Sequence, residues 1–196
     1  MCVEWCKPSC VDAPYVNRHA LFILKVCPLQ LRLQSTKSML DNTDGMCKLH
    51  RFNNIELTKF LLYFNGIHIV QSSSYYETLS WPDPKKPKFL NIIISIKSNL
   101  LPEKLLTIFK KIEQHLGRKI TKKNSPRECD IDIIDYKKRI IKGNITIPHK
   151  KMHKRNFVLI PLYEINKSWI HPKFKTNIKK LIFSLPIKDI RSIKQI

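Results

Sequence analysis

Two carboxylates stand one residue apart in the stretch CDIDIIDY, where Asp130 and Asp132 are separated by Ile131. Successive side chains of a strand point to opposite faces, so the two aspartates share one face, with Cα atoms roughly 6.5–7 Å apart. Magnesium binds through one or two carboxylates and completes its shell with phosphate oxygens and water. The pair can therefore serve metal-assisted phosphoryl transfer, although an Asp-x-Asp pair taken alone is weak evidence for it. The alternative is a pair that only faces solvent.

Cationic and aromatic residues flank this pair in the sequence. Arg127 lies just upstream, behind a basic loop that begins at Arg118, and the downstream segment IPHKKMHKRNF carries His149, Arg155 and Phe157. Carboxylates for a metal, cations for phosphate and an aromatic side chain for a flat ring form a consistent set. They indicate transfer from a nucleoside triphosphate to a planar substrate, which needs positioning and charge neutralisation more than covalent chemistry.

Hydrophobic periodicity and turn residues predict the elements that must position these side chains. The expected elements are a helix over 55–64, a strand over 67–78, a strand over 89–97, a helix over 102–116 and a strand over 129–136. One further strand in front would complete the βαββαβ order of a ferredoxin-like α+β sandwich. That first strand is uncertain, because it would have to come from residues 21–33.

Composition changes sharply near residue 52. Of 27 isoleucines, 26 lie after it, whereas five of six cysteines lie before it. The first 52 residues carry a net charge of +3 and the remainder +18. We therefore divide the chain into residues 1–52, an atypical N-terminal segment that is aberrant or poorly ordered, and residues 53–196, the domain that carries the motifs.

The net charge of +21 admits a polyanionic partner such as nucleic acid. The lysines are scattered along the sequence rather than grouped in blocks, and no base-stacking aromatic pattern accompanies them. Most of the charge is therefore interpreted as solvated surface. A basic nucleic-acid-binding module remains an alternative. No apolar run reaches the roughly 18 residues that span a bilayer, and a cytoplasmic protein is expected.

The linked stretches PRECDIDIIDY and IPHKKMHKRNFVLIPLYEI resemble the signature of 6-hydroxymethyl-7,8-dihydropterin pyrophosphokinases (HPPK), enzymes of folate biosynthesis. The resemblance extends through SSSYYET, KPKFLNIIISI and PEKLLTIFKKIEQHLGR and covers roughly residues 54–172. It implies an HPPK-like fold with residues 53–196 as the catalytic domain. It also implies 2-amino-4-hydroxy-6-hydroxymethyldihydropteridine diphosphokinase activity, an ATP-dependent transfer of pyrophosphate to 6-hydroxymethyl-7,8-dihydropterin that releases AMP.

The resemblance further implies a role for each matching residue. Two magnesium ions would be held by Asp130 and Asp132, and Arg127 and Arg155 would stabilise charge in the transition state. The ATP contacts would be Lys110, Arg118, Ile133, Thr146 and His149, and the pterin contacts Thr78, Phe89, Asn91 and Phe157. ATP and the dihydropterin are the expected partners of a monomer that binds neither nucleic acid nor membrane.

Two departures from the family pattern bear on activity. The family's first strand runs into Gly-Ser-Asn, which this sequence lacks, so we hypothesise that the start has been replaced. In the basic loop, Asn124 stands where many members have tryptophan and Ile120 where they have arginine. The alternative to an active enzyme is therefore a catalytically impaired relative that lacks the first strand.

Overall fold

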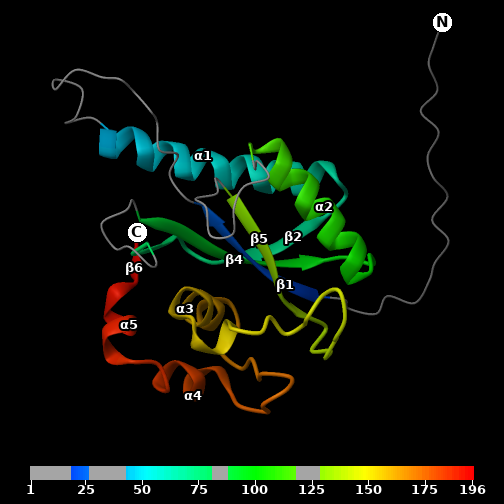
Figure 1. The fold of residues 1–196 in the computed structure, drawn as a ribbon, viewed down its shortest axis with the longest axis vertical. Helices are drawn as coiled ribbons and strands as arrows, with labels where there is room; N and C mark the ends of the chain where they lie inside the picture. The colour runs from blue at the N-terminus through cyan, green and yellow to red at the C-terminus, as the bar shows by residue number, and fades with distance from the viewer. Residues whose placement is uncertain (1–18, 27–42, 81–87, 118–128) are drawn as a thin grey trace, which may run out of the picture.

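The computed structural model describes residues 19–26, 43–80, 88–117 and 129–196 (Figure 1). They form a six-stranded sheet with helices on both faces. The elements are β1 (His19–Val26), α1 (Thr43–Phe64), β2 (His68–Ser72), β3 (Tyr76–Thr78), β4 (Phe89–Lys97), α2 (Pro102–His115), β5 (Cys129–Tyr136), η2 (Met152–Lys154), α3 (Asn156–Ile165), α4 (Ile178–Phe183), α5 (Ile187–Ser192) and β6 (Lys194–Gln195).

The strand order is β5-β1-β4-β3-β6, and β2 also pairs with β4. Each of these pairings is antiparallel. The predicted strand over 67–78 is thus divided into β2 and β3 by a serine-rich link in which Ser73 and Ile93 exchange hydrogen bonds of 2.9 Å. Counted together, β2 and β3 take the place of one strand, and the order matches the predicted ferredoxin-like arrangement.

Strand β1 lies at the centre of the sheet, between β4 and β5. Its pairing with β4 runs from His19 opposite Lys97 to Val26 opposite Leu90. The first strand, which the sequence left uncertain, is therefore present as β1, and the alternative of a relative that lacks it is contradicted. Ladder hydrogen bonds come from the backbone, and a continuous apolar run suits a strand that is buried on both faces, so the stretch ALFIL pairs without the Gly-Ser-Asn motif.

Helix α1 crosses the boundary that composition suggests at residue 52 and begins well before the predicted start at residue 55. Arg51, just N-terminal to this boundary, is buried. It donates from Nη1 to Glu77 Oε1 at 3.2 Å and to the Lys88 carbonyl at 2.8 Å. The compositional boundary thus falls inside one helix that is tied to β3 and to the start of β4. The aberrant origin of residues 1–52 stays a prediction.

The sheet separates two apolar cores, and in Figure 1 α1 and α2 cover one face of the sheet while α3 and α4 cover the other. Phe22 and Ile92 pack with Phe109 beneath α1 and α2, whereas Ile23 and Ile93 pack with residues of α3 and α4 on the other face. Burial on both faces explains why the central strands read as apolar runs rather than as alternating patterns. The face beneath α3 is the one that carries the polar residues considered next.

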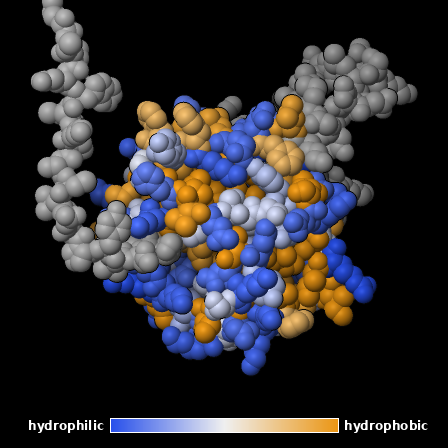
Figure 2. All heavy atoms as spheres, turned by 180° about the vertical axis from the view of Figure 1, so that it is seen from behind, coloured by the Kyte–Doolittle hydropathy of each residue, from blue (hydrophilic) through white to orange (hydrophobic). Residues whose placement is uncertain are grey.

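Apolar side chains are exposed at the upper edge of the space-filling view, where α1 lies (Figure 2). Near the C-terminal end of α1, Phe60, Tyr63 and Phe64 are 60%, 66% and 78% exposed. In the described part of the chain, no helix has both the length and the apolar character needed to cross a bilayer.

Candidate functional site

A row of polar residues crosses the neighbouring strands β4, β1 and β5 near one end of the sheet. In the ladders, Lys25 of β1 lies opposite Asn91 of β4 on one side and opposite Asp130 of β5 on the other. Directly opposed residues of antiparallel strands project from the same face, so these three side chains share a face. Asp132, opposite Ile23, projects two residues further along it. Both aspartates are half-buried, while Ile131 between them is fully buried.

Arg155 and His149 lie within electrostatic reach of the aspartates. Burial lowers the pKa of the Arg155 guanidinium, and the charges of Asp132 and Asp130 oppose that shift. Burial likewise lowers the pKa of His149, which Asp132 opposes and Arg155 reinforces. Two carboxylates, one guanidinium and one imidazole therefore form a single electrostatic cluster beside β5.

The hydrogen bonds of His149 determine which ring nitrogen can donate. Its Nδ1 accepts from the backbone N–H of Lys151 at 3.3 Å, while the backbone N–H of His149 donates to the Ile134 carbonyl at 3.2 Å. A neutral imidazole that accepts at Nδ1 carries its proton on Nε2. His149 can therefore donate from Nε2 to an anionic oxygen near Asp132.

Asn91 has a buried acceptor that lacks a partner among the described residues. Its Nδ2 donates to the Tyr76 carbonyl at 3.2 Å and to Thr78 Oγ1 at 3.0 Å, so both amide hydrogens are used. Its Oδ1 is buried without a hydrogen bond. Most buried polar atoms of native proteins are satisfied, so this oxygen suggests a ligand that supplies a donor.

Two aromatic rings accompany this amide. Phe89 is two residues before Asn91 on β4 and projects from the same face, and Phe157 comes from the start of α3. Both are half-buried. The Arg155 guanidinium carbon lies 5.5 Å from the centre of the Phe157 ring. The rings, the amide and the charged cluster thus lie together at one end of this face.

Lys25 is a site residue that sequence reasoning missed. Its Nζ lies 3.8 Å from the centre of the Phe89 ring and 5.2 Å from that of Phe157. The available signal was a single charge inside the apolar run ALFILKV, since a lysine in a central strand must reach solvent or a partner.

The residues expected at the nucleotide lie in three places. Lys110 of α2 pairs with Glu113 at 2.9 Å, and Glu113 accepts from the Ile131 N–H at 2.8 Å. The Ile133 side chain is buried in the core beneath α1 and α2, on the face of the sheet opposite to the one that carries Asp130 and Asp132. Thr146 and His149 line one cavity of about 120 Å³. Arg118 and Arg127 lie outside the described residues.

Glu113 was also missed by sequence reasoning. It is fully buried as a side chain, and it satisfies an outward backbone N–H on β5, the edge strand next to α2. This hydrogen bond and the ion pair with Lys110 explain why an acidic side chain is tolerated among the buried residues of α2. Its role in the described structure is to hold α2 on the strand that carries the aspartates.

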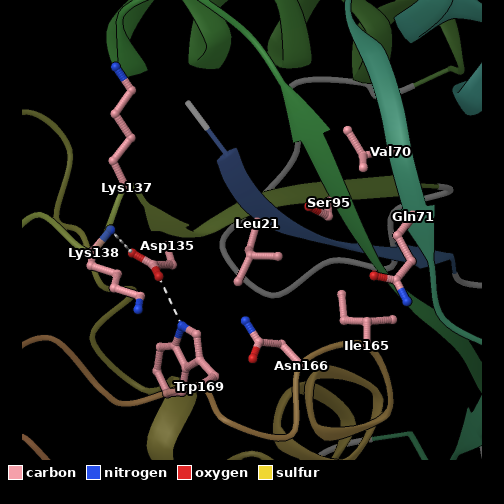
Figure 3. A pocket seen from close by; sticks show the side chains of 10 residues that line it. All are labelled: Leu21, Val70, Gln71, Ser95, Asp135, Lys137, Lys138, Ile165, Asn166 and Trp169. Atoms are coloured by element: carbon pink, nitrogen blue, oxygen red, sulfur yellow. Dashed lines mark hydrogen bonds between the residues drawn. The ribbon is translucent and has the colours of Figure 1, made fainter. Parts of the chain in front are cut away.

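A larger pocket of about 440 Å³ lies elsewhere, at the other end of the same face (Figure 3). There Asp135 accepts from Trp169 Nε1 at 2.9 Å and from the Lys138 N–H at 3.1 Å. Burial raises the pKa of this carboxyl group. The hydrogen bond between Asp135 and Trp169 explains how the segment after α3 is fixed to the sheet.

His171 provides a stability prediction from the same region. Burial, followed by the neighbouring His153, lowers its pKa to about 4, whereas an unfolded histidine titrates near 6.5. The unfolded chain therefore binds more protons between these values, and the His171 contribution to stability decreases as pH falls from about 6.5 to about 4. We expect His171→Gln to weaken this pH dependence in thermal unfolding measured by circular dichroism; an unchanged slope would contradict it.

The described residues contain no cluster of three or more histidines, cysteines or acids that could hold a metal by themselves. Asp130 and Asp132 offer oxygen ligands only. This donor set fits magnesium, which uses few protein carboxylates together with substrate phosphates.

Comparison with known proteins places the chain in a family. The model of the 7,8-dihydro-6-hydroxymethylpterin-pyrophosphokinase (HPPK) family matches residues 47–167. The chain is 38% identical over 115 residues to the 2-amino-4-hydroxy-6-hydroxymethyldihydropteridine pyrophosphokinase of Aquifex aeolicus and covers 72% of that protein. The corresponding Synechocystis protein is 36% identical over 118 residues, and the chain spans 60% of its length; in both alignments about 60% of this chain is aligned.

A crystal structure of Plasmodium falciparum HPPK-DHPS with pterin and p-hydrobenzoate has the same fold, with a TM-score of 0.61. The match covers 94% of this chain and 48% of that one at 12% sequence identity, so it supports the fold alone. The family match covers more than half of the chain and includes β4, α2, β5 and α3. The chain therefore belongs to the 7,8-dihydro-6-hydroxymethylpterin-pyrophosphokinase family.

Proposed function

We propose that the chain transfers pyrophosphate from ATP to 6-hydroxymethyl-7,8-dihydropterin and releases AMP. The observation that carries the proposal is the unpartnered Oδ1 of Asn91, buried beside Phe89 on the face that holds Asp130 and Asp132. A flat heterocycle with N–H donors would satisfy the amide oxygen and stack on the ring. The nearby carboxylates and cations suit a bound triphosphate.

In this proposal, the substrate hydroxymethyl oxygen attacks the β-phosphorus, the bond to the oxygen of the α-phosphate breaks, and AMP leaves with that electron pair. The hydroxyl proton passes to water, since no residue is assigned as general base. Asp130 and Asp132 would hold two magnesium ions, which when bound neutralise the charge of the triphosphate. Arg155 and His149 would donate to phosphate oxygens, where charge-assisted hydrogen bonds are strong.

Family membership supports this chemistry, and the electrostatic cluster supports the phosphate side of it. Thr78 would act through Asn91, because its Oγ1 accepts one amide hydrogen and fixes the amide orientation. Lys110, Arg118, Ile133 and Thr146 remain proposed nucleotide contacts, and Arg127 a proposed catalytic residue.

A coupled assay of AMP release tests the proposal directly. Purified full-length chain is mixed with ATP, magnesium and 6-hydroxymethyl-7,8-dihydropterin, and AMP is measured with and without the pterin. We expect AMP to appear only when both substrates are present. AMP release that is independent of the pterin would contradict pyrophosphate transfer.

Asn91→Leu tests the pterin side. The substitution removes the amide while keeping a similar volume, so substrate donors would lose their acceptor. We expect the pterin dissociation constant to rise about tenfold to a hundredfold, with the affinity for a non-hydrolysable ATP analogue unchanged, both measured by isothermal titration calorimetry.

Ser95→Ala is the matched control for Asn91→Leu. Ser95 is a buried polar residue four positions further along β4, on the same face, and it lines the pocket of Figure 3. Its removal should leave pterin affinity within about twofold. Equal losses of pterin affinity in both variants would show that Asn91 acts through the stability of the fold rather than through a hydrogen bond to the pterin.

The remaining expectations stay predictions: a monomer, in the cytoplasm, without nucleic-acid binding. The nucleic-acid alternative predicts affinity for RNA or DNA that falls steeply with salt. The impaired-relative alternative no longer has a missing strand to support it, because β1 is present. One observation still favours this alternative: the Lys25 ammonium lies over the Phe89 ring, where the pterin is proposed to stack.

A further inference from the structure

The side chain of Lys25 lies in the space where the proposed substrate would stack. Its ammonium nitrogen is 3.8 Å from the centre of the Phe89 ring. Atoms of a ring stacked on Phe89 would lie at the same van der Waals separation, about 3.5–4.0 Å. The ammonium and a stacked pterin therefore cannot both contact this face of Phe89.

Phe157 attracts the same ammonium from a second element. The Nζ atom lies 5.2 Å from the centre of its ring, within the roughly 6 Å over which a cation is attracted by an aromatic face. Lys25 is half-buried, and its backbone is fixed in the central strand by ladders to Asn91 and Asp130. Only the flexible side chain can move, so leaving the rings is a rotamer change rather than a movement of the sheet.

Resting on the proposed function, we propose that Lys25 sets the affinity and selectivity of the pterin site by filling the aromatic slot until a planar substrate displaces it. A flat ring gains stacking on Phe89 only after both cation–π contacts are broken. Non-aromatic ligands gain no stacking to offset that loss and are excluded. The ammonium stays on the face it shares with Asp130, because the ladder places the two residues opposite each other.

The experiment measures pterin affinity in the full chain, by isothermal titration calorimetry with 6-hydroxymethyl-7,8-dihydropterin, magnesium and a saturating non-hydrolysable ATP analogue. Lys25→Ala empties the slot. Two cation–π contacts at a half-buried site correspond to an expected gain in pterin affinity of about threefold to thirtyfold. Lys25→Arg keeps a cation over the rings and should remain near the wild-type affinity.

Lys179→Ala is the matched control, because Lys179 also lies over an aromatic ring, 5.9 Å from the centre of Tyr163, but outside the site. It should leave pterin affinity unchanged. An unchanged or weaker affinity in Lys25→Ala would overturn the proposal, since it would mean that Lys25 is neutral or assists the substrate.

A second readout does not depend on pterin binding. In protein labelled with ¹³C-lysine, the ε-methylene signal that disappears in Lys25→Arg should be shifted upfield by the ring current and should move downfield when pterin is added. Absence of the upfield shift would contradict the proposal that the Lys25 side chain fills the aromatic slot. A shifted signal together with no pterin binding in any variant contradicts the proposed function, and the role of Lys25 as a selectivity residue falls with it.

Discussion

Asp132→Ala is expected to reduce AMP release by at least about a thousandfold at saturating ATP and magnesium. The variant loses one of two carboxylates that would hold the metal ions. It also loses the negative charge that Arg155 and His149 both face. Asp130→Ala should have a comparable effect, because the metal pair needs ligands from both residues. The measurement is the coupled AMP assay under single-turnover conditions.

The fold should survive either change. Each aspartate is half-buried, and β5 is anchored from its other face by the buried side chains of Ile131 and Ile133. Asp135→Asn is the control on the same strand: its carboxylate bonds Trp169 and the Lys138 N–H, away from the proposed site. It should lower the melting temperature while leaving AMP release within about twofold. Turnover retained in Asp132→Ala would refute the metal role.

Much of the fold follows from the sequence because the strongest periodic segments coincide with observed elements. The predicted strands over 89–97 and 129–136 are β4 and β5, and the predicted helix over 102–116 is α2 to within one residue of its end. In these segments, the apolar pattern and the flanking Pro102 and Gly117 agree, so local preference and tertiary burial favour the same structure.

The start of the chain was harder to predict for physical reasons. An apolar run buried on both faces has no period that distinguishes a strand from a buried helix, and composition suggested a boundary inside what is one helix, α1. Contacts such as Arg51 with Glu77 join residues distant in sequence and leave no local signal. The shared face of Asp130 and Asp132 was predictable from period 2, whereas the approach of Lys25 to Phe89 depends on strand order.

Phe22→Ala tests whether β1 belongs to the folded domain. Phe22 is fully buried in the core beneath α1 and α2, with its ring centre 4.8 Å from that of Phe109 in an edge-on contact. Removing a buried phenylalanine ring loses its transfer free energy and leaves a cavity, so the free energy of unfolding should fall by about 3–5 kcal/mol. Urea denaturation followed by circular dichroism measures the change.

The control for this experiment is Phe183→Ala, since Phe183 is 81% exposed and its removal should change the free energy of unfolding by less than about 0.5 kcal/mol. If residues 1–52 were an aberrant start that does not fold, Phe22→Ala would behave like this control. A loss of several kcal/mol would instead show that β1 is inserted between β4 and β5 in solution. Because Lys25 lies on this strand, the same result would establish the framework on which its position over Phe89 depends.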